Sequence, residues 1–272
     1  MSENRSTEIA TRDIVCADGL PAFVAHPAGS GRYPVVVLMH ERYGLVQHTR
    51  DLAMRCARDG FYTVAPNFFY KHPDLNALNA GNSRYDLSDP ESVAYSKAAL
   101  AVVAGDRAAN CDKIAIVGFC QTGRHPLAFA AEVPISAVGI WYGAASAREW
   151  PASKLAPRPL EDLIAAVGCP VFGAFGSQDH IISVADVRRF REALEKHGKS
   201  YDINIYSGAP HGWLNDTMPG RYRKRQAEAG WADQQRFLKR VLVEDQAGTD
   251  IWQSFAAEIE RDYDFTKNVR LE

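Results

Sequence analysis

Long apolar runs are missing from this sequence. The longest, such as AVGIWYGAA from residue 137 onward, are far too short to cross a membrane. The first residues, MSENRSTEIATRD, are polar and carry acids, and they contain no apolar segment of the kind that a secretory signal needs. These absences together favour a cytoplasmic protein.

An excess of charge of one sign is also missing. The chain has 31 Lys and Arg against 33 Asp and Glu, a formal net charge of −2, so no strong basic field attracts a nucleic acid. It also has no glycine-rich phosphate loop and no cluster with metal-ligand spacing. We therefore expect no nucleic-acid partner, no metal and no cofactor. A small molecule is the expected partner, and a homodimer is compatible with the sequence, which does not decide the oligomeric state.

The cysteines lack the spacing of a disulfide framework or a zinc site. There are five of them, an odd number, and no two form a CxxC pair. This pattern fits a reducing compartment. Four of the five are interpreted as small buried apolar residues. The fifth, Cys120, stands on a sharp turn. The five are Cys16, Cys56, Cys111, Cys120 and Cys169.

Short apolar runs alternate with helical patterns along most of the chain. The runs at 34–39, 61–69, 113–118, 137–143 and 170–176 are typical of strands buried on both faces. The helical patterns occupy 45–60, 89–105, 123–132, 183–198 and 223–242, and Asp89 is the expected N-cap of the second. This alternation predicts an α/β protein whose mostly parallel central sheet carries helices on both faces.

The ends of this sheet can also be assigned. Residues 13–18 and 21–27 predict an antiparallel edge hairpin, and 201–208 alternates like an edge strand. The polar segment 71–90 is expected to border the site. We expect one domain over 1–245 and a C-terminal extension over 246–272. The extension is expected to pack on the domain or on a partner through apolar side chains, which are Trp252, Phe255 and Ile259.

Cys120 follows a buried strand and precedes a helix, in the segment GFCQTG. Ligands bind where parallel strands end, and a nucleophile on a strained strand-to-helix turn is exposed there. The free N–H groups and the positive end of the helix favour a thiolate. Thr122 stands where the second glycine of such a turn is expected, and Gly123 comes one residue later. The alternative is a buried cysteine at a helix start.

Two further residues lie past strand ends in the order that a catalytic triad requires. Asp179 follows the strand at 170–176, and His211 follows the strand at 201–208. A nucleophile, an acid and a histidine in this order predict a Cys-His-Asp triad. The neighbouring His180 and Asp216 are ranked below them.

With these residues, the chain resembles the dienelactone hydrolase family of the α/β-hydrolase fold. The resemblance covers most of the chain and is carried by MHERYGL, VGFCQTG, FGSQDHII and APHGWLNDTMPGRY. It implies Cys120 as nucleophile, His211 as general base and Asp179 as its orienting acid. It also implies that Glu41 lies beside the nucleophile and takes the thiol proton when substrate enters. The alternative for Glu41 is a cap on the following helix.

Two peptide N–H groups, those of Gln121 and Arg42, are the expected oxyanion hole. Family members that open a dienelactone hold its carboxylate with arginines, and here Lys71 and Arg84 occupy the first such region. Asn215 and Asp216 stand where the second arginine is expected. Aromatic residues at strand ends suggest a flat apolar pocket, with core packing as the alternative. The expected substrate-binding residues are Lys71, Arg84, Tyr43, Phe69, Tyr142 and Trp213.

The sequence therefore predicts a hydrolase that opens a lactone or cleaves an ester through an acyl-enzyme on Cys120. Three alternatives stay open. They are a catalytically silent α/β-hydrolase used for binding, a general carboxylesterase of aromatic esters, and a redox-sensing thiol protein. The last would need a resolving cysteine, and none lies near Cys120 in the sequence.

Overall fold

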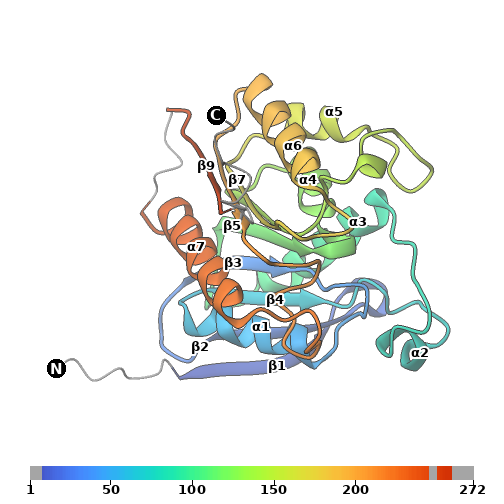
Figure 1. Ribbon diagram of the computed structural model, residues 1–272. Coiled ribbons are helices and arrows are strands. Elements are labelled where there is room, and N and C mark those ends of the chain that lie inside the picture. Colours follow the sequence, from blue (N-terminus) through green and yellow to red (C-terminus); the bar gives the residue numbers. More distant parts are fainter. Residues whose placement is uncertain (1–7, 245–249, 259–272) are drawn as a thin grey trace, which may run out of the picture.

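The computed structural model describes residues 8–244 and 250–258, and it contains one nine-stranded sheet (Figure 1). The strand order is β1-β2-β4-β3-β5-β6-β7-β8-β9. Strands β3 to β9 are mutually parallel, and β1 and β2 form the antiparallel hairpin predicted at one edge. The strands are β1 Ile9–Val15, β2 Pro21–Pro27, β3 Tyr33–Leu38, β4 Tyr62–Pro66, β5 Ala109–Phe119, β6 Ala137–Trp141, β7 Val171–Gly176, β8 Tyr201–Tyr206 and β9 Gln253–Ala257.

Helices cover both faces of the sheet, as the alternating pattern predicts (Figure 1). Two of them, α1 and α7, bury their apolar sides on one face, and α3 to α6 cover the other. The short α2 lies within the segment 71–90. None of the helices in the described ranges is long and apolar enough to cross a membrane. The helices are α1 Gln47–Arg58, α2 Leu75–Asn79, α3 Asp89–Val103, α4 His125–Ala130, α5 Leu160–Ala166, α6 Val184–Lys196 and α7 Lys224–Leu242.

Burial on both faces explains the apolar runs. Val35, Val36 and Val37 of β3 are all fully buried, because one helix layer covers each face of this central strand. Each such side chain contributes about 1.5–3 kcal/mol to folding. The prediction of a mostly parallel sheet between two helix layers is confirmed.

The predicted cap of α3 is wrong by one residue. Ser88 is the N-cap, and its hydroxyl accepts a hydrogen bond from the Glu91 N–H at 3.3 Å. Asp89 is the first helical residue instead. Its carboxylate is not free to cap the helix because it binds the guanidinium of Arg124.

The prediction that residues 201–208 form an edge strand is also wrong. Strand β9 pairs with β8 and occupies the edge. β9 pairs with β8 from Tyr201 to Ile205, and the side chains of β8 still alternate between buried and half-buried over its first four residues. β9 lies within the expected extension, where Phe255 packs under Arg191 and Trp252 under Arg240.

Of the expected extension, only residues 250–258 are among the described residues. Ile259, the third apolar residue expected to pack, lies beyond the described residues. The division of the chain at residue 245 stays a prediction.

Candidate active site

Cys120 lies on a strained turn at the end of β5. Its φ angle is +53°, in the left-handed region that residues other than glycine rarely adopt. Glycines permit the turn on either side. A Cβ on Gly118 would lie 2.4 Å from the Thr122 carbonyl oxygen, and one on Gly123 would lie 2.6 Å from the Gly143 Cα. The turn therefore depends on close backbone approaches, and it leaves Cys120 partly accessible.

The structure brings Cys120, His211 and Asp179 together. The His211 Nε2 lies 3.0 Å from the Cys120 Sγ, and its Nδ1 lies 2.8 Å from the Asp179 Oδ2. The other Asp179 oxygen accepts hydrogen bonds from the N–H groups of Ile181 and Ile182, at 2.7 and 3.0 Å. The His211 Nδ1 therefore donates a hydrogen bond to the Asp179 carboxylate, and Nε2 faces the sulfur.

This environment makes His211 a strong base. Burial favours the neutral imidazole, but the hydrogen bonds with Asp179 and Cys120 outweigh it and raise the pKa of His211 to about 9. The charge of Asp179 acts in the same direction. The ring is therefore oriented and made basic by the same carboxylate.

His180 and Asp216, the residues ranked lower, are not part of the predicted triad's contacts. The His180 ring packs edge-on against the His211 ring, with 6.0 Å between centroids. Asp216 is 63% exposed and pairs with His48 at 3.1 Å. Neither residue is placed between His211 and Cys120.

Glu41 is buried, and two donors hold its carboxylate. The Tyr142 hydroxyl donates to one oxygen at 2.8 Å, and the Asn215 Nδ2 donates to the other at 2.6 Å. The Asn215 oxygen accepts from both the N–H and the hydroxyl of Thr217, which fixes the orientation of the amide. The alternative role for Glu41, as a helix cap, is wrong. Helix α1 begins after Val46, without a side-chain cap.

Tyr142 is a secure donor to this carboxylate. Burial, together with the adjacent Glu41 charge, raises the pKa of Tyr142 well above its ordinary value, so its hydroxyl keeps its proton. Its backbone φ of +36° places it on a second strained turn, directly after β6. The ring lies 5.4 Å from the His211 ring between centroids. Tyr142 therefore contacts both Glu41 and the catalytic histidine of the predicted triad.

The chain matches a model of the dienelactone hydrolase family over residues 20–242. The chain belongs to the dienelactone hydrolase family. A candidate carboxymethylenebutenolidase of Methylorubrum extorquens is 30% identical over 237 residues, which is 85% of this chain and 80% of that protein. A Bradyrhizobium protein named as a candidate 2-oxo-3-(5-oxofuran-2-ylidene)propanoate lactonase is 27% identical over 224 residues, 80% of this chain and 88% of that protein.

Solved structures agree with the family assignment at the level of the fold. A candidate dienelactone hydrolase of Klebsiella pneumoniae superposes with a TM-score of 0.77 at 24% identity, covering 86% of this chain and 99% of that one. An acylaminoacyl peptidase of Pyrococcus horikoshii superposes over 91% of this chain and 44% of its own, with a TM-score of 0.66 at 14% identity. The α/β-hydrolase fold is thus confirmed, and the protein is an ester or lactone hydrolase of the dienelactone hydrolase family.

The two residues of the expected oxyanion hole have anchored side chains. Arg42 donates from Nη2 to the Gly81 carbonyl at 2.9 Å, and Gln121 donates from Nε2 to the Tyr85 carbonyl at 2.5 Å. Gln121 also lines a cavity of about 230 Å³ together with Arg84 and Arg148. One expected substrate-binding residue therefore shares a cavity with one expected oxyanion-hole residue.

The other expected substrate-binding residues are dispersed. The Lys71 ammonium lies over the Tyr70 and Tyr95 rings, and Tyr43 donates to the Met218 sulfur at 3.4 Å. Phe69 and Trp213 are fully buried. Trp213 packs on Trp141 and Tyr206, and Phe69 packs on His40 and Tyr85. For Phe69 and Trp213 the structure shows the core packing that was the alternative to a pocket.

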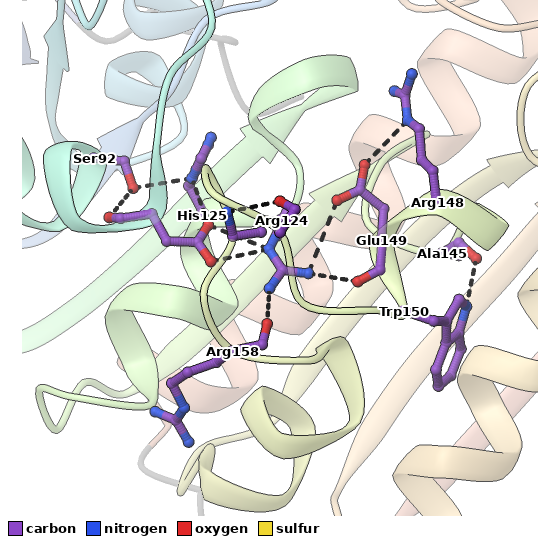
Figure 2. Close-up of polar contacts among 11 residues, drawn as sticks. Ser92, Arg124, His125, Ala145, Arg148, Glu149, Trp150 and Arg158 are labelled. Atoms are coloured by element: carbon purple, nitrogen blue, oxygen red, sulfur yellow. Dashed lines mark hydrogen bonds and ion pairs between the residues drawn. The ribbon is translucent and has the colours of Figure 1, made fainter.

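A buried ionic cluster directly after the turn was missed by sequence reasoning (Figure 2). Arg124 binds both oxygens of Asp89, at 3.2 and 3.1 Å, and also donates to the carbonyls of Glu149 and Arg158. His125 contacts Ser92 at 3.0 Å. The one available signal was an arginine within an otherwise apolar helix start. Its partner is 35 residues away, which no local pattern reveals. The cluster ties the turn to α3 and to the segment before α5.

Proposed function

We propose that this protein hydrolyses a lactone or ester through an acyl-enzyme formed on Cys120. The observation that carries the proposal is the chain of contacts from the Cys120 sulfur through His211 to Asp179, at 3.0 and 2.8 Å. These distances lie in the range that proton transfer requires.

In the proposed first half-reaction, Glu41 takes the thiol proton as substrate enters, and the Cys120 thiolate, beside the protonated His211, attacks the carbonyl carbon. A C–S bond forms, and the carbonyl π electrons move onto oxygen. When the tetrahedral intermediate collapses, the bond to the leaving oxygen breaks, and His211 gives its proton to that oxygen. In a lactone the leaving oxygen stays attached to the acyl group. Asp179 orients the imidazole and stabilises its charged form.

In the second half-reaction, water replaces the thiol. His211 accepts a proton from water, the resulting hydroxide attacks the thioester carbon, and the C–S bond breaks. The carboxylic acid leaves, Glu41 returns its proton to the Cys120 sulfur, and His211 is again in its protonated form. In both halves the peptide N–H groups of Gln121 and Arg42 would stabilise the oxyanion, and each such donor contributes about 3–4 kcal/mol to barrier lowering.

The proposed role of Glu41 is to regulate the thiol. A carboxylate in the same buried site disfavours the thiolate form of Cys120. The neutral thiol that remains resists oxidation. In the arrangement described above, Tyr142 and Asn215 hold the Glu41 carboxylate while the thiol contacts His211. We propose that this is the reactive arrangement, and that Glu41 takes the thiol proton when substrate enters.

The family and its named relatives, which include a candidate lactonase, support the proposed substrate class. We propose lactones and activated aryl esters as substrates. We also propose a cytoplasmic location, which the five free cysteines support. A homodimer stays a prediction.

Intact-protein mass spectrometry tests the acyl-enzyme. The protein is mixed with aryl esters and lactones and quenched with acid within the first turnovers. We expect an added acyl mass that peptide mapping places on Cys120, and none on the Cys120→Ala variant. Cys169, a thiol 7% exposed, provides the matched control, since Cys169→Ala should acylate normally. Turnover without any adduct on Cys120 would refute the covalent mechanism.

A further inference from the structure

The hydroxyl of Thr122 lies between the ends of β3 and β5, just where the two strands separate. Its side chain is fully buried. The Thr122 Oγ1 accepts a hydrogen bond from the Phe119 N–H at 3.0 Å. The same oxygen donates to the His40 carbonyl at 2.9 Å, with the Phe119 carbonyl also within reach at 3.0 Å. One hydroxyl therefore joins the two strand ends.

The ladder between these strands stops just before this point. Its last bond along the chain runs from the Met39 N–H to the Val117 carbonyl at 2.8 Å. Beyond it, one chain turns into Cys120 and the other into Glu41. Here the Phe119 N–H and the His40 carbonyl bond to the Thr122 hydroxyl, and a buried peptide group left unpaired would cost about 1–3 kcal/mol. A hydroxyl can satisfy both groups because it accepts and donates, whereas glycine in this place could do neither.

His40 is itself held on both sides, so this link is rigid. Its Nδ1 donates to the Glu41 carbonyl at 2.8 Å, and its Nε2 accepts from the Phe68 N–H at 3.0 Å. Burial lowers the pKa of His40 to about 4, so the ring stays neutral and keeps this pattern. A displacement at Thr122 would therefore pass directly into the loop that carries Arg42.

We propose that Thr122 is a positioning residue that sets the spacing of the oxyanion hole. Thr122 follows Gln121, and the His40 carbonyl lies two residues before Arg42, so its two hydrogen bonds connect the two halves of the hole. Thr122 touches no reacting atom and acts through the two peptide N–H groups. The inference rests on the proposed thiol-acyl mechanism and explains why a threonine replaces the glycine expected there.

The test distinguishes an effect on the oxyanion hole from an effect on the reactivity of the thiol. Thr122→Val keeps the shape and removes the hydroxyl, and Thr122→Ser keeps the hydroxyl. We expect Thr122→Val to lower kcat/KM for an aryl ester by about 10- to 100-fold, because a small displacement of an oxyanion donor has costs of this size. Thr122→Ser should stay within about threefold of the wild type. Thr63→Val, the same change at a fully buried threonine of β4, should leave kcat/KM unchanged.

Two readouts distinguish this role from general loss of structure. An aryl trifluoromethyl ketone forms a C–S bond with Cys120, whose thiol proton passes to Glu41, and places an alkoxide in the hole. Its inhibition constant should rise by the same factor as kcat/KM falls in Thr122→Val. Alkylation of Cys120 by iodoacetamide creates no oxyanion, so its rate and pH profile should match the wild type.

Several results would overturn the inference. One is a Thr122→Val variant with kcat/KM within threefold of the wild type, and another is alkylation that slows in parallel with turnover. If Thr122→Val is insoluble, Thr122→Ala provides the same comparison, and loss of the fold in both would make the hydroxyl a folding determinant instead. Failure of the proposed function itself would be visible in the wild type, which would then form no acyl-enzyme.

Discussion

Replacing Glu41 with Gln should activate the resting thiol while impairing turnover. The side chain is 5% exposed, and its charge is held by Tyr142 and Asn215. Gln keeps the size of the side chain and can keep both contacts. Its oxygen accepts from Asn215, whose orientation Thr217 fixes, and its amide donates to the Tyr142 oxygen. What the variant loses is the negative charge.

The magnitude follows from the removed charge. A like charge in the same buried site disfavours a thiolate, so the loss of that charge should favour the thiolate form of Cys120. Alkylation follows the thiolate fraction, and its rate at neutral pH should rise about tenfold. Exchanging charged for neutral hydrogen bonds should also lower the free energy of unfolding by about 1–2 kcal/mol.

The assay is the pH profile of Cys120 alkylation by iodoacetamide, read by mass spectrometry beside steady-state turnover of an aryl ester. Glu195→Gln is the matched control, because Glu195 also accepts a tyrosine hydroxyl, that of Tyr201 at 2.6 Å, but lies on α6 outside the site. The control should change neither measurement. If the alkylation profiles of Glu41→Gln and the wild type overlay, Glu41 does not regulate the thiol, and its role is limited to packing.

Substitutions at Cys120, His211 and Asp179 test the proposed triad. Cys120→Ala should abolish hydrolysis with little change in melting temperature, since a partly exposed side chain on a turn loses few contacts, and Cys120→Ser should lose most activity because an alkoxide needs a stronger base than a thiolate. His211→Ala should be more impaired than Asp179→Ala in kcat/KM, and the double variant should match His211→Ala, whereas additive losses would show that the two do not act as a unit. Because folding raises the pKa of His211 from 6.5 to about 9, its protonation stabilises the fold fully below pH 6.5, and this contribution is lost as the pH rises through 9. Urea unfolding at pH 6 and 9.5 should show a smaller loss of stability in His211→Gln than in the wild type, and equal losses would contradict the raised pKa.

The three residues of the proposed triad could be placed near one another from the sequence because parallel strands end at one edge of a sheet. Cys120, Asp179 and His211 each follow an apolar run, so knowing the fold class was enough to bring them near one another. The exact pairing of Asp179 rather than Asp216 with His211 depended on loop conformation. Hydrogen bonds from the Ile181 and Ile182 N–H groups to Asp179 fix that conformation. Their geometry cannot be predicted from the order of residue types along the chain.

The surroundings of Glu41 could not be predicted for a different reason. Tyr142 was expected to contact substrate, and Asn215 stood where the family resemblance suggested an arginine, yet both donate to the same buried carboxylate. They are 101 and 174 residues from Glu41 in the chain. Similarly, aromatic residues at strand ends give no sign of whether they face a pocket or, like Trp213, the core.

Thr122 departs from the expected turn motif, and only the three-dimensional structure explains why. In a motif with glycines on both sides of the nucleophile, the glycines allow backbone segments to approach closely. Here Gly118 and Gly123 still allow such close approaches. The position between nucleophile and second glycine is therefore free to carry a side chain, provided that its atoms satisfy the buried groups they meet. Threonine meets that condition because its hydroxyl accepts from Phe119 and donates to His40. The same residue that made the turn look distorted in the sequence thus closes the gap between the two strands that frame the proposed oxyanion hole.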